Sequence, residues 1–378
     1  MTGTVLTCGY VPLVDAAPLL IAQELGFAAD EGLTLDLVRQ PSWSALRDML
    51  AFGHLDAAHM LSPMPVAMAL GLGGPSAEID VLSVLSVNGT VFGVSLDLAA
   101  RLGPLPFGDA KALLAALASQ TVRIGVPFHA SMHRLLLSYW LSSRPDLNIE
   151  IITIPPPRMA DAITQGQVDA FWVGEPWGSV AVQRGVAQLM MAGRNVWGFA
   201  PEKVLATRAA WTRGHPEETR RLMRAVYRAG KWLDTHGNKP LAVEILARSE
   251  HLDLVPDLID PSISGDIVPL RGSQPVTIPR FQLFHRHAAQ FPWRSQAAWI
   301  ALQLGADADG IERAKACFRS DLYRQALGPI GVDLPGASEK IEGSMPHETA
   351  VSSTRGHMIL GPDAFFDGRT FDFTPSER

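Results

Sequence analysis

The chain has 378 residues, of which 47% are hydrophobic and only 19% are charged, and its net charge at pH 7 is -6. That length and apolar content can fill two sizeable cores, and 33 glycines with 28 prolines supply the many turns of an alternating α/β fold. The acidic balance gives no general attraction to nucleic acid or to anionic membranes, so direct nucleic-acid binding is excluded as a first interpretation.

The N-terminal segment begins with a strand at residues 4–11, where apolar and polar residues alternate. A helix at 16–25 follows, with Asp15 placed as its N-cap and Gly26 ending it. A secretory signal needs a basic start and an apolar stretch, but the first basic residue is Arg39. No run approaches the roughly 18 apolar residues of a membrane span. We therefore expect a cytoplasmic protein without membrane insertion.

Two stretches of the chain follow one plan. The first runs from residue 31 to 58 and the second from 148 to 171, and each contains a strand, a short helix, a glycine and another strand. Two similar α/β units in one chain predict two lobes with a cleft between them. The elements expected around and within the second unit are strands at 81–87, 90–95, 121–126, 149–154 and 168–173 and helices at 131–141 and 158–164.

The C-terminal part is predicted to be largely helical up to residue 328 and loop-rich beyond it. A long helix at 215–235 carries a basic stripe, which is either a solvated face or a docking surface for an acidic partner. The segment 360–374 contains four phenylalanines, and we expect so much aromatic surface to be packed onto a domain.

Catalytic motifs are missing from the sequence. There is no Gly-x-Ser-x-Gly elbow, no His-Glu-x-x-His and no phosphate-binding Gly-Lys-Ser/Thr, so we expect neither an enzyme nor a cofactor. His129 and His133 could share a helix face but lack a nearby acid, so we expect no metal site. Cys8 and Cys317, the two cysteines, are expected to be small buried hydrophobes.

The strand-to-helix junctions are candidate anion sites. Residues 42–44 and 155–158 lie where new helices begin, and the first N–H groups of a helix lack intrahelical partners. The helix dipole adds partial positive charge there, about 0.3 to 1 kcal/mol at exposed sites. Two such junctions facing one another would bind an anion in the cleft.

Five motifs together carry a family resemblance that covers nearly the whole chain. They lie at residues 9–18, 56–65, 155–157, 174–177 and 201–205. With them the chain resembles the nitrate/bicarbonate group of ABC-transporter solute-binding proteins. Each motif alone would be weak, but the combination is specific.

The resemblance implies an α/β, two-lobed, periplasmic-binding-protein-like fold of type II, with the ligand cleft between the lobes. One lobe would comprise residues 1–92 and 206–330, and the other residues 93–205. Residues 331–378 would form a loop-rich extension packed on the first lobe.

The resemblance also places a ligand site. Trp43 would form a wall, Thr90 would offer a hydroxyl and His133 a ring N–H. Pro157 would shape the backbone edge and Lys203 would supply the countercharge. Bicarbonate-binding relatives are expected to carry an acid where Lys203 stands, so the lysine favours a permanent anion such as nitrate.

Two positions depart from the family pattern, and every site residue has a structural alternative. An amide side chain is usual where Thr90 stands and a glutamine where Arg158 stands, so the ranking of nitrate against nitrite stays open. The alternatives are plain core for Trp43, a solvent-facing helix position for His133, a turn former for Pro157 and a surface position for Lys203.

Within the group, a chain without an export signal is similar to the NasS-type cytoplasmic nitrate/nitrite sensors. Such a sensor holds an RNA-binding antiterminator of the ANTAR type inactive until the anion binds, and so controls nitrate assimilation genes. The rival interpretation is a solute-binding component of a nitrate (or related anion) ABC transporter whose leader was lost through a misassigned start. A third, an enzyme of the related pyrimidine-synthesis branch, lacks its Cys-rich motif here.

Overall fold

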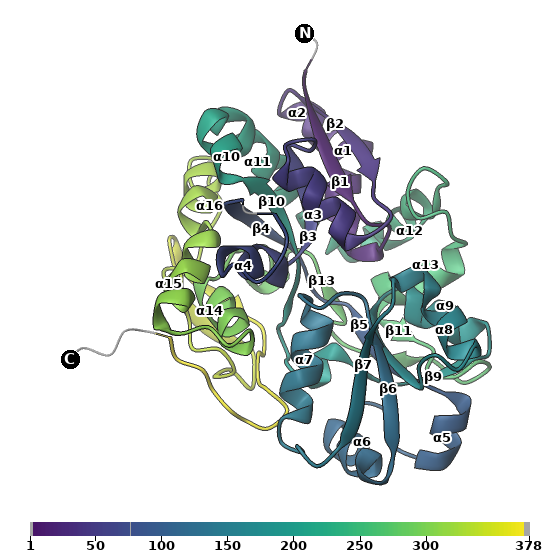
Figure 1. Cartoon of the computed structure of the whole chain (residues 1–378). Helices are drawn as coiled ribbons and strands as arrows, with labels where there is room; N and C mark the ends of the chain where they lie inside the picture. The colour runs from purple at the N-terminus through teal and green to yellow at the C-terminus, as the bar shows by residue number, and fades with distance from the viewer. Residues whose placement is uncertain (1–2, 76, 374–378) are drawn as a thin grey trace.

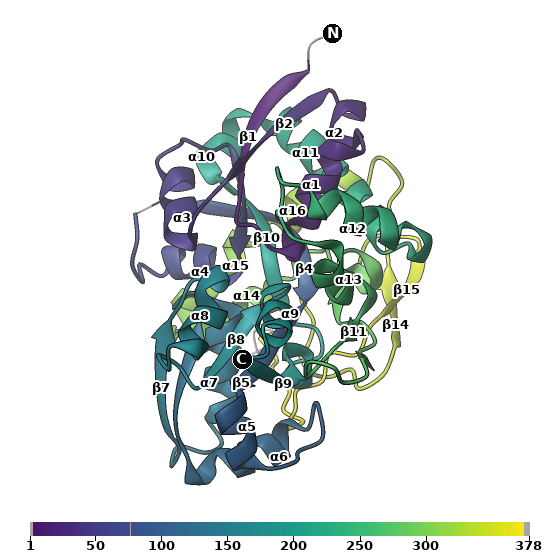
Figure 2. The same ribbon diagram turned by 90° about the vertical axis from the view of Figure 1, so that its right-hand side faces the viewer.

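Two β-sheets, one above the other, divide the computed structural model, which describes residues 3–75 and 77–373 (Figure 1 and Figure 2). The first sheet has the strand order β13-β4-β10-β3-β1-β2. Strand β1 pairs in parallel with β2 and β3, whereas β10 runs antiparallel to both of its neighbours. The strands of this sheet are β1 (Thr4–Tyr10), β2 (Leu33–Arg39), β3 (Ala57–Leu61), β4 (Ile79–Asn88), β10 (Pro201–Arg208) and β13 (Gln282–Leu283).

The second sheet repeats this plan with five strands in the order β7-β6-β8-β5-β9. Here β6 pairs in parallel with β7 and β8, and β5 runs antiparallel to β8 and β9. The two-lobed α/β fold expected from the internal echo is thus confirmed. The strands are β5 (Thr90–Ser95), β6 (Thr121–Val126), β7 (Asn148–Thr153), β8 (Ala170–Gly174) and β9 (Ala187–Ala192).

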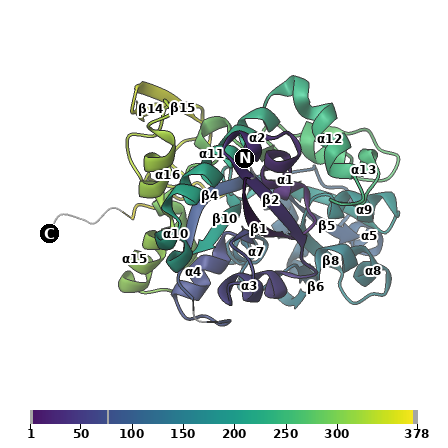
Figure 3. The same cartoon turned by 90° about the horizontal axis from the view of Figure 1, so that it is seen from above.

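Helices cover both sheets. Seen from above, α1, α2 and α11 lie together over the first sheet (Figure 3). The helices of the N-terminal two-thirds are α1 (Ala17–Glu24), α2 (Phe27–Asp30), α3 (Trp43–Ala51), α4 (Pro63–Ala69), α5 (Leu96–Leu102), α6 (Ala110–Ala116), α7 (Met132–Leu141), α8 (Met159–Thr164), α9 (Trp177–Gln183), α10 (Ala209–Gly214) and α11 (Pro216–Leu233). The later elements are α12 (Lys239–Ala247), α13 (Pro256–Ser264), β11 (Asp266–Ile267), β12 (Val276–Thr277), α14 (Arg294–Gln303), α15 (Ala308–Cys317), α16 (Ser320–Leu327), β14 (Thr349–Ser353) and β15 (Gly356–Leu360). Among the described residues, no helix is both long and apolar enough to cross a membrane.

The chain passes between the sheets at two places. It leaves the first sheet through Gly89, which connects β4 to β5 and has a φ of 85°. It returns through residues 193–200. Both strands that follow a crossing begin at once, so β5 starts before the expected lobe boundary at 92 and β10 before that at 206. The Asn88 side chain links the crossings, because it accepts from Ala200 N at 3.1 Å and donates to Gly198 O at 3.0 Å.

The C-terminal extension packs on more than the first lobe. Phe365 is buried and stacks on Trp197, with 4.8 Å between ring centroids, and on Trp299 of α14. It also contacts Tyr139 of α7, which covers the second sheet, and the Tyr139 hydroxyl donates to Asp367 at 2.8 Å. In Figure 1 this yellow segment runs from beside α14 to the end of α7. The extension therefore joins the two lobes, because its phenylalanines follow the seam between α14 and α7.

Two arginines of the basic stripe on α11 are engaged inside the molecule rather than freely solvated. Arg228 lies 3.0 Å from Glu31, and Arg224 lies 3.7 Å from the same carboxylate and donates to Ala326 O. The stripe therefore fixes α11 against the end of α2 and α16. Of the two cysteines, Cys8 is buried as expected, whereas Cys317 is only partly covered.

Candidate functional site

Lys203 lies in the middle of the first sheet, in β10, and its side chain is completely buried. Its Nζ atom lies 2.6 Å from Asp15 Oδ2 and 2.8 Å from Glu202 Oε1. Side chains of consecutive strand residues normally point to opposite faces. The pairing of β10 with β4 is irregular on both sides of Lys203, and such a bulge re-aims side chains, which accounts for the contact between neighbours.

Asp15 belongs to this site rather than to a helix end. It lies in the short 3-10 turn at Val14–Ala16 and makes no side-chain cap, so its expected role as N-cap of the following helix is wrong. Its Oδ2 atom faces Lys203, and its Oδ1 atom lies 2.8 Å from Nε2 of His59 in β3. A buried carboxylate needs partners of this kind, and the lysine and histidine outcompete a backbone cap.

His133 reaches the same place from the second lobe. It is in the first turn of α7, where Ser131 Oγ accepts the Arg134 N–H at 3.2 Å as N-cap. Its Nδ1 atom lies 3.3 Å from Glu202 Oε1, without the geometry of a hydrogen bond. Gly174, at the end of β8, keeps this junction open, because a Cβ there would lie 3.0 Å from Leu13. The two lobes meet at these residues.

Trp43 closes the site from the N-terminus of α3. Ser42 caps that helix through its Oγ atom, which accepts the Ala45 N–H at 3.2 Å. The indole is 2% exposed, its ring centroid lies 5.5 Å from that of His59, and Lys203 Nζ lies 5.3 Å from its centre. The cation therefore rests against an aromatic face as well as against two acids.

Asp15, Trp43, His59, His133, Glu202 and Lys203 are called the Lys203 cluster below. Burial alone would raise the pKa of Asp15, but Lys203 and His59 outweigh burial and hold that pKa at about 2. Burial opposes the charge on Lys203, and the two acids overcome it, so its pKa is raised above the ordinary value. These two residues form the permanently charged pair of the cluster.

Of the remaining titratable members, the two histidines are neutral at physiological pH and Glu202 titrates near it. Burial raises the pKa of Glu202 to about 7 despite the opposing pull of Lys203. Burial also lowers the pKa of His59, and it lowers that of His133 well below the ordinary value, with the charge of Lys203 adding to the effect. The cluster thus carries one proton on Glu202 that can be lost near neutrality.

Several buried polar atoms of the cluster lack a hydrogen-bond partner among the described residues. They are Trp43 Nε1, His59 Nδ1, both ring nitrogens of His133 and Glu202 Oε2. Lys203 has three N–H bonds, of which Asp15 and Glu202 engage two. An unsatisfied buried donor costs about 1–3 kcal/mol, so this concentration of donors around one cation marks a place where an acceptor-rich ligand would be stabilised.

Two predicted site residues lie differently from the others. Thr90 is 1% exposed and pairs across the sheet with Gly174, and its hydroxyl accepts from Trp172 Nε1 at 3.0 Å but can still donate its own proton. Pro157 is exposed on the 3-10 turn Pro156–Arg158. Its contribution to the edge of the ligand site stays a prediction.

Sequence reasoning missed Asp15, His59 and Glu202 as members of the site. One signal for two of them was present: Glu202 and His59 interrupt strands that are otherwise buried and mainly apolar. Charged or titratable groups in such strands need a partner inside the protein. No such signal existed for Asp15, because an aspartate before a helix is equally typical of a cap.

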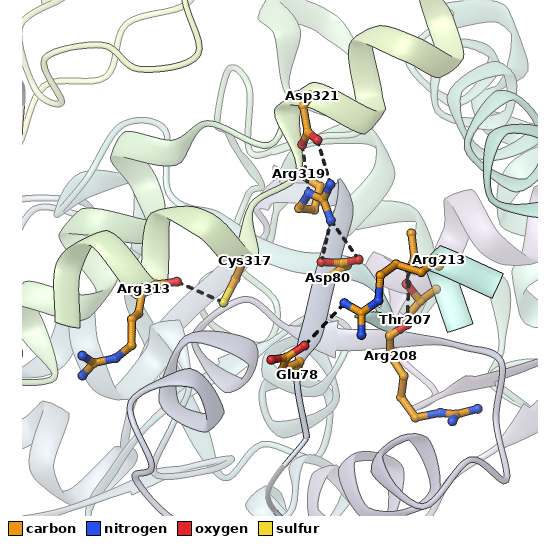
Figure 4. Close-up of polar contacts among 10 residues, drawn as sticks. Glu78, Asp80, Thr207, Arg208, Arg213, Arg313, Cys317, Arg319 and Asp321 are labelled. Carbon is orange, nitrogen blue, oxygen red and sulfur yellow. Dashed lines mark hydrogen bonds and ion pairs between the residues drawn. The ribbon is translucent and has the colours of Figure 1, made fainter. Parts of the chain in front are cut away.

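A cavity outside the Lys203 cluster is less suited to an anion. It measures about 410 Å³ and lies between α4, α10 and α15. Both acids of its lining are paired: Asp80 lies 3.1 Å from Arg319, and Glu78 lies 3.5 Å from Arg213 (Figure 4). This arrangement fixes the start of β4.

Comparison with known proteins places the chain among solute-binding proteins. A model of the NMT1-like family matches residues 2–247. The nitrate/nitrite binding protein NrtA of Synechococcus elongatus is 30% identical over an alignment 392 residues long, which covers 97% of this chain and 83% of that protein. The crystal structure of the periplasmic nitrate-binding protein NrtA from Synechocystis superimposes with a TM-score of 0.85 at 27% identity, covering 98% of this chain and 96% of the other.

A second kind of relative is longer. The nitrate import ATP-binding protein NrtC of Synechocystis is 32% identical over 343 residues, which cover 88% of this chain and 51% of that protein. The chain thus spans about half the length of the NrtC proteins that it matches. The NrtA relatives are binding proteins, and the chain is placed with them rather than with enzymes.

Proposed function

Because the chain belongs to the NMT1-like family, and within it to the nitrate- and bicarbonate-binding group of solute-binding proteins that includes NrtA, we propose that it binds one nitrate or nitrite ion at the Lys203 cluster. The observation that carries this proposal is the set of buried donors without partners around Lys203. Trp43 Nε1, a ring N–H of His133 and the third N–H of Lys203 would each donate to an oxygen of the anion. A planar ion with several acceptor oxygens satisfies these donors without carrying protons of its own.

The charge balance of the cluster fits a monoanion. Lys203 and Asp15 neutralise one another. Glu202, whose pKa is about 7, is uncharged in its protonated form. A monoanion then meets a neutral, donor-rich site, whereas the Asp15 carboxylate would repel a dianion about twice as strongly as a monoanion. We propose that this balance favours nitrate or nitrite over sulfate.

The size of the ligand limits its affinity. The best small ligands gain about -1.5 kcal/mol per non-hydrogen atom, so a four-atom ion is bounded near about -6 kcal/mol, or tens of micromolar. Titration calorimetry with nitrate, nitrite, bicarbonate and alkanesulfonates would rank the ions. Nitrate binding weaker than bicarbonate binding would overturn the assignment of the ion.

A matched pair of variants tests the site itself. Trp43 and Trp293 are each 2% exposed with an indole N–H that has no partner among the described residues, but only Trp43 belongs to the cluster. Trp43→Phe should weaken nitrate binding by about tenfold, because a hydrogen bond to a charged group contributes about 1.5–3 kcal/mol. Trp293→Phe should leave it unchanged. Equal effects of both substitutions would place the ion elsewhere.

We further propose that the protein is a cytoplasmic sensor that holds an RNA-binding antiterminator of the ANTAR type and releases it when the anion binds, thereby controlling nitrate assimilation genes. The resemblance to NasS-type sensors supports this role, as does a candidate ligand site at the junction of two lobes, where a bound ion would contact both. Shifting a two-state balance from 1:99 to 99:1 needs about 5.5 kcal/mol, nearly everything that a four-atom ligand supplies. Release should therefore be graded, and excess antiterminator should override it.

The alternative role is that of the solute-binding component of a nitrate (or related anion) transporter, and the names of the NrtA and NrtC relatives favour it. Gel filtration of the protein mixed with an ANTAR-type antiterminator, with and without nitrate, separates the two roles. A complex that nitrate dissociates supports the sensor. A complex that never forms, or that persists while calorimetry detects bound nitrate, supports transport.

A further inference from the structure

Two neighbouring cavities lie on the first lobe, away from the Lys203 cluster. The first has a volume of about 320 Å³ and lies between α11, α16 and the β14–β15 hairpin. The second, of about 390 Å³, lies beside α12 and the segment 277–282. Both are lined by Arg286 and His287, so the two cavities adjoin one another. Each falls in the range of about 300–1,000 Å³ that small-molecule sites occupy.

The first cavity is lined by aromatic rings. Tyr227 of α11 meets the His285 ring edge-on at 4.9 Å, and Tyr323 of α16 meets Phe291 in the same manner at 5.5 Å. Met358 of β15 contributes an apolar side chain to the same lining. Walls of this kind bury a flat ring efficiently, because aromatic pairs favour edge-to-face and offset contacts.

The polar atoms of this cavity have defined roles. Gln290 Nε2 donates to Val226 O at 3.0 Å, which identifies Oε1 as the acceptor for His285 Nδ1 at 3.3 Å. Burial lowers the pKa of His285, so the ring is neutral and its Nε2 atom carries a lone pair. The Tyr323 side chain is 3% exposed, and its hydroxyl makes no hydrogen bond with the described residues. A heterocycle with one N–H donor and one ring-nitrogen acceptor would satisfy both side chains, because the N–H would donate to His285 Nε2 and the ring nitrogen would accept from the Tyr323 hydroxyl.

The second cavity is basic. Its lining includes His236, Lys239, Arg280 and Arg286, and the one carboxylate among its described lining residues is Glu348. That acid lies 3.3 Å from Arg280, whereas the exposed Arg286 guanidinium has no ion pair with the described residues. The excess positive charge is suited to an anionic group.

The backbone between the cavities is held in an unusual conformation. His287 and Ala288 have φ values of 60° and 56°, in the left-handed region that residues with side chains rarely adopt. The Asp234 carboxylate holds the turn, since its Oδ2 atom accepts from His285 N at 2.8 Å and from Arg286 N at 2.6 Å. Conformations of this kind cost free energy and persist where the surrounding structure requires a particular shape.

We propose that the two cavities form one binding site for a mononucleotide, a nitrogen heterocycle that carries an anionic group. The base lies in the aromatic cavity between Tyr227 and Tyr323 and donates an N–H to His285 Nε2. The phosphate lies in the basic cavity beside Arg286. This site is separate from the Lys203 cluster and does not depend on nitrate binding.

Calorimetry on the full chain with AMP, adenosine and inorganic phosphate tests the proposal. AMP should bind, adenosine should bind roughly tenfold more weakly, and phosphate should bind more weakly than either, because the loss of one charge-assisted contact is worth about a factor of ten. Absence of AMP binding would overturn the proposal. So would phosphate that binds as tightly as AMP, since the aromatic cavity would then contribute nothing.

Three variants assign the contacts. Arg286→Ala should weaken AMP binding about tenfold and leave adenosine binding unchanged. Tyr227→Leu should weaken both, and Arg248→Ala, which removes an exposed arginine paired with Glu24, should affect neither. Equal losses in Arg286→Ala and Arg248→Ala would overturn the assignment. Nitrate titrations of the same variants should match the unmodified protein, so failure at this site is distinguishable from failure at the Lys203 cluster.

Discussion

The Nζ atom of Lys203 lies 2.6 Å from Oδ2 of Asp15, and both side chains are buried. This ion pair joins the turn after the first strand to a strand formed by the chain on its return from the second lobe. A buried pair of this kind contributes little net stability when intact, but removal of one partner leaves an uncompensated charge. The pair therefore makes folding depend on the residues that would hold the ligand.

Replacement of Lys203 should separate its effect on nitrate binding from its effect on folding stability. Lys203→Met should lower the free energy of unfolding by about 3–5 kcal/mol, because Asp15 remains buried and charged, and should abolish nitrate binding. The double variant Asp15→Asn with Lys203→Met should recover most of that stability and still fail to bind. Urea unfolding and calorimetry measure the two effects. Nitrate binding that survives in the double variant would contradict the proposed site.

Nitrate affinity should depend on pH through Glu202. Its pKa of about 7 means that the cluster loses a proton above neutrality and gains a negative charge, which repels the anion. Affinity should fall by up to about tenfold per pH unit from about pH 7 to 9. Asp15 stays ionised, His59 and His133 stay neutral and Lys203 stays charged in this range.

The corresponding variant is Glu202→Gln, which should flatten that pH dependence and bind more tightly than the unmodified protein at pH 8. Calorimetry at pH 6, 7 and 8 in buffers of different ionisation enthalpy would also count the protons taken up. A Glu202→Gln protein with the original pH dependence would assign the titration to another group.

The same carboxyl group should affect folding stability in a defined direction. Its pKa is raised from 4.5 to about 7 in the folded state, so the folded protein holds the proton more tightly than the unfolded chain. Its contribution is fully present below pH 4.5 and is lost as the pH rises through about 7. Urea midpoints of the unmodified protein should therefore fall between pH 5 and pH 8 by more than those of Glu202→Gln.

Substitution of the exposed Pro157 tests whether the turn at 156–158 takes part in ion binding. Because Pro157 is exposed, Pro157→Ala should change nitrate affinity by no more than about threefold, which is less than the roughly 1.4 kcal/mol of a tenfold change. Sulfate should compete poorly in both proteins, since the Asp15 carboxylate repels a dianion. A large loss of affinity in Pro157→Ala would indicate that the turn at 156–158 moves onto the ion when it binds.

Removal of one hydroxyl should loosen the C-terminal extension. Tyr139→Phe deletes the bonds to Asp367 and should lower the free energy of unfolding by about 1.5–3 kcal/mol, as expected for a hydrogen bond to a charged group. Limited proteolysis should then cleave the extension faster. Tyr10→Phe, which removes a hydroxyl bonded to Glu250 O, is the control and should leave that cleavage rate unchanged.

The fold could be predicted from local patterns, because strand alternation, helix periodicity and glycine stops recur in the order that two α/β lobes require. The crossings between the sheets were misplaced by a few residues, since Thr90 and Pro201 begin strands immediately after a turn. The packing of the extension on α7 depends on contacts between Tyr139 and distant phenylalanines, which no local pattern encodes.

The candidate site was predicted in part. Trp43, His133 and Lys203 come together in the cluster, and the resemblance located them. The acids that pair with Lys203 were not found, because a single aspartate before a helix is also typical of a cap and because adjacent strand residues normally face apart. The β-bulge that overrides this alternation is not visible in the sequence around Glu202.

The two crossings at Gly89 and 193–200 form a two-strand hinge, about which the lobes would rotate. The C-terminal extension adds a third attachment away from that axis, where Phe365 lies against both Trp299 and Tyr139. A third attachment away from the hinge axis restricts rotation of the lobes unless that attachment shifts. We expect any opening of the lobes to require movement of these aromatic rings, so that the C-terminal extension would influence how readily an ion enters or leaves the Lys203 cluster.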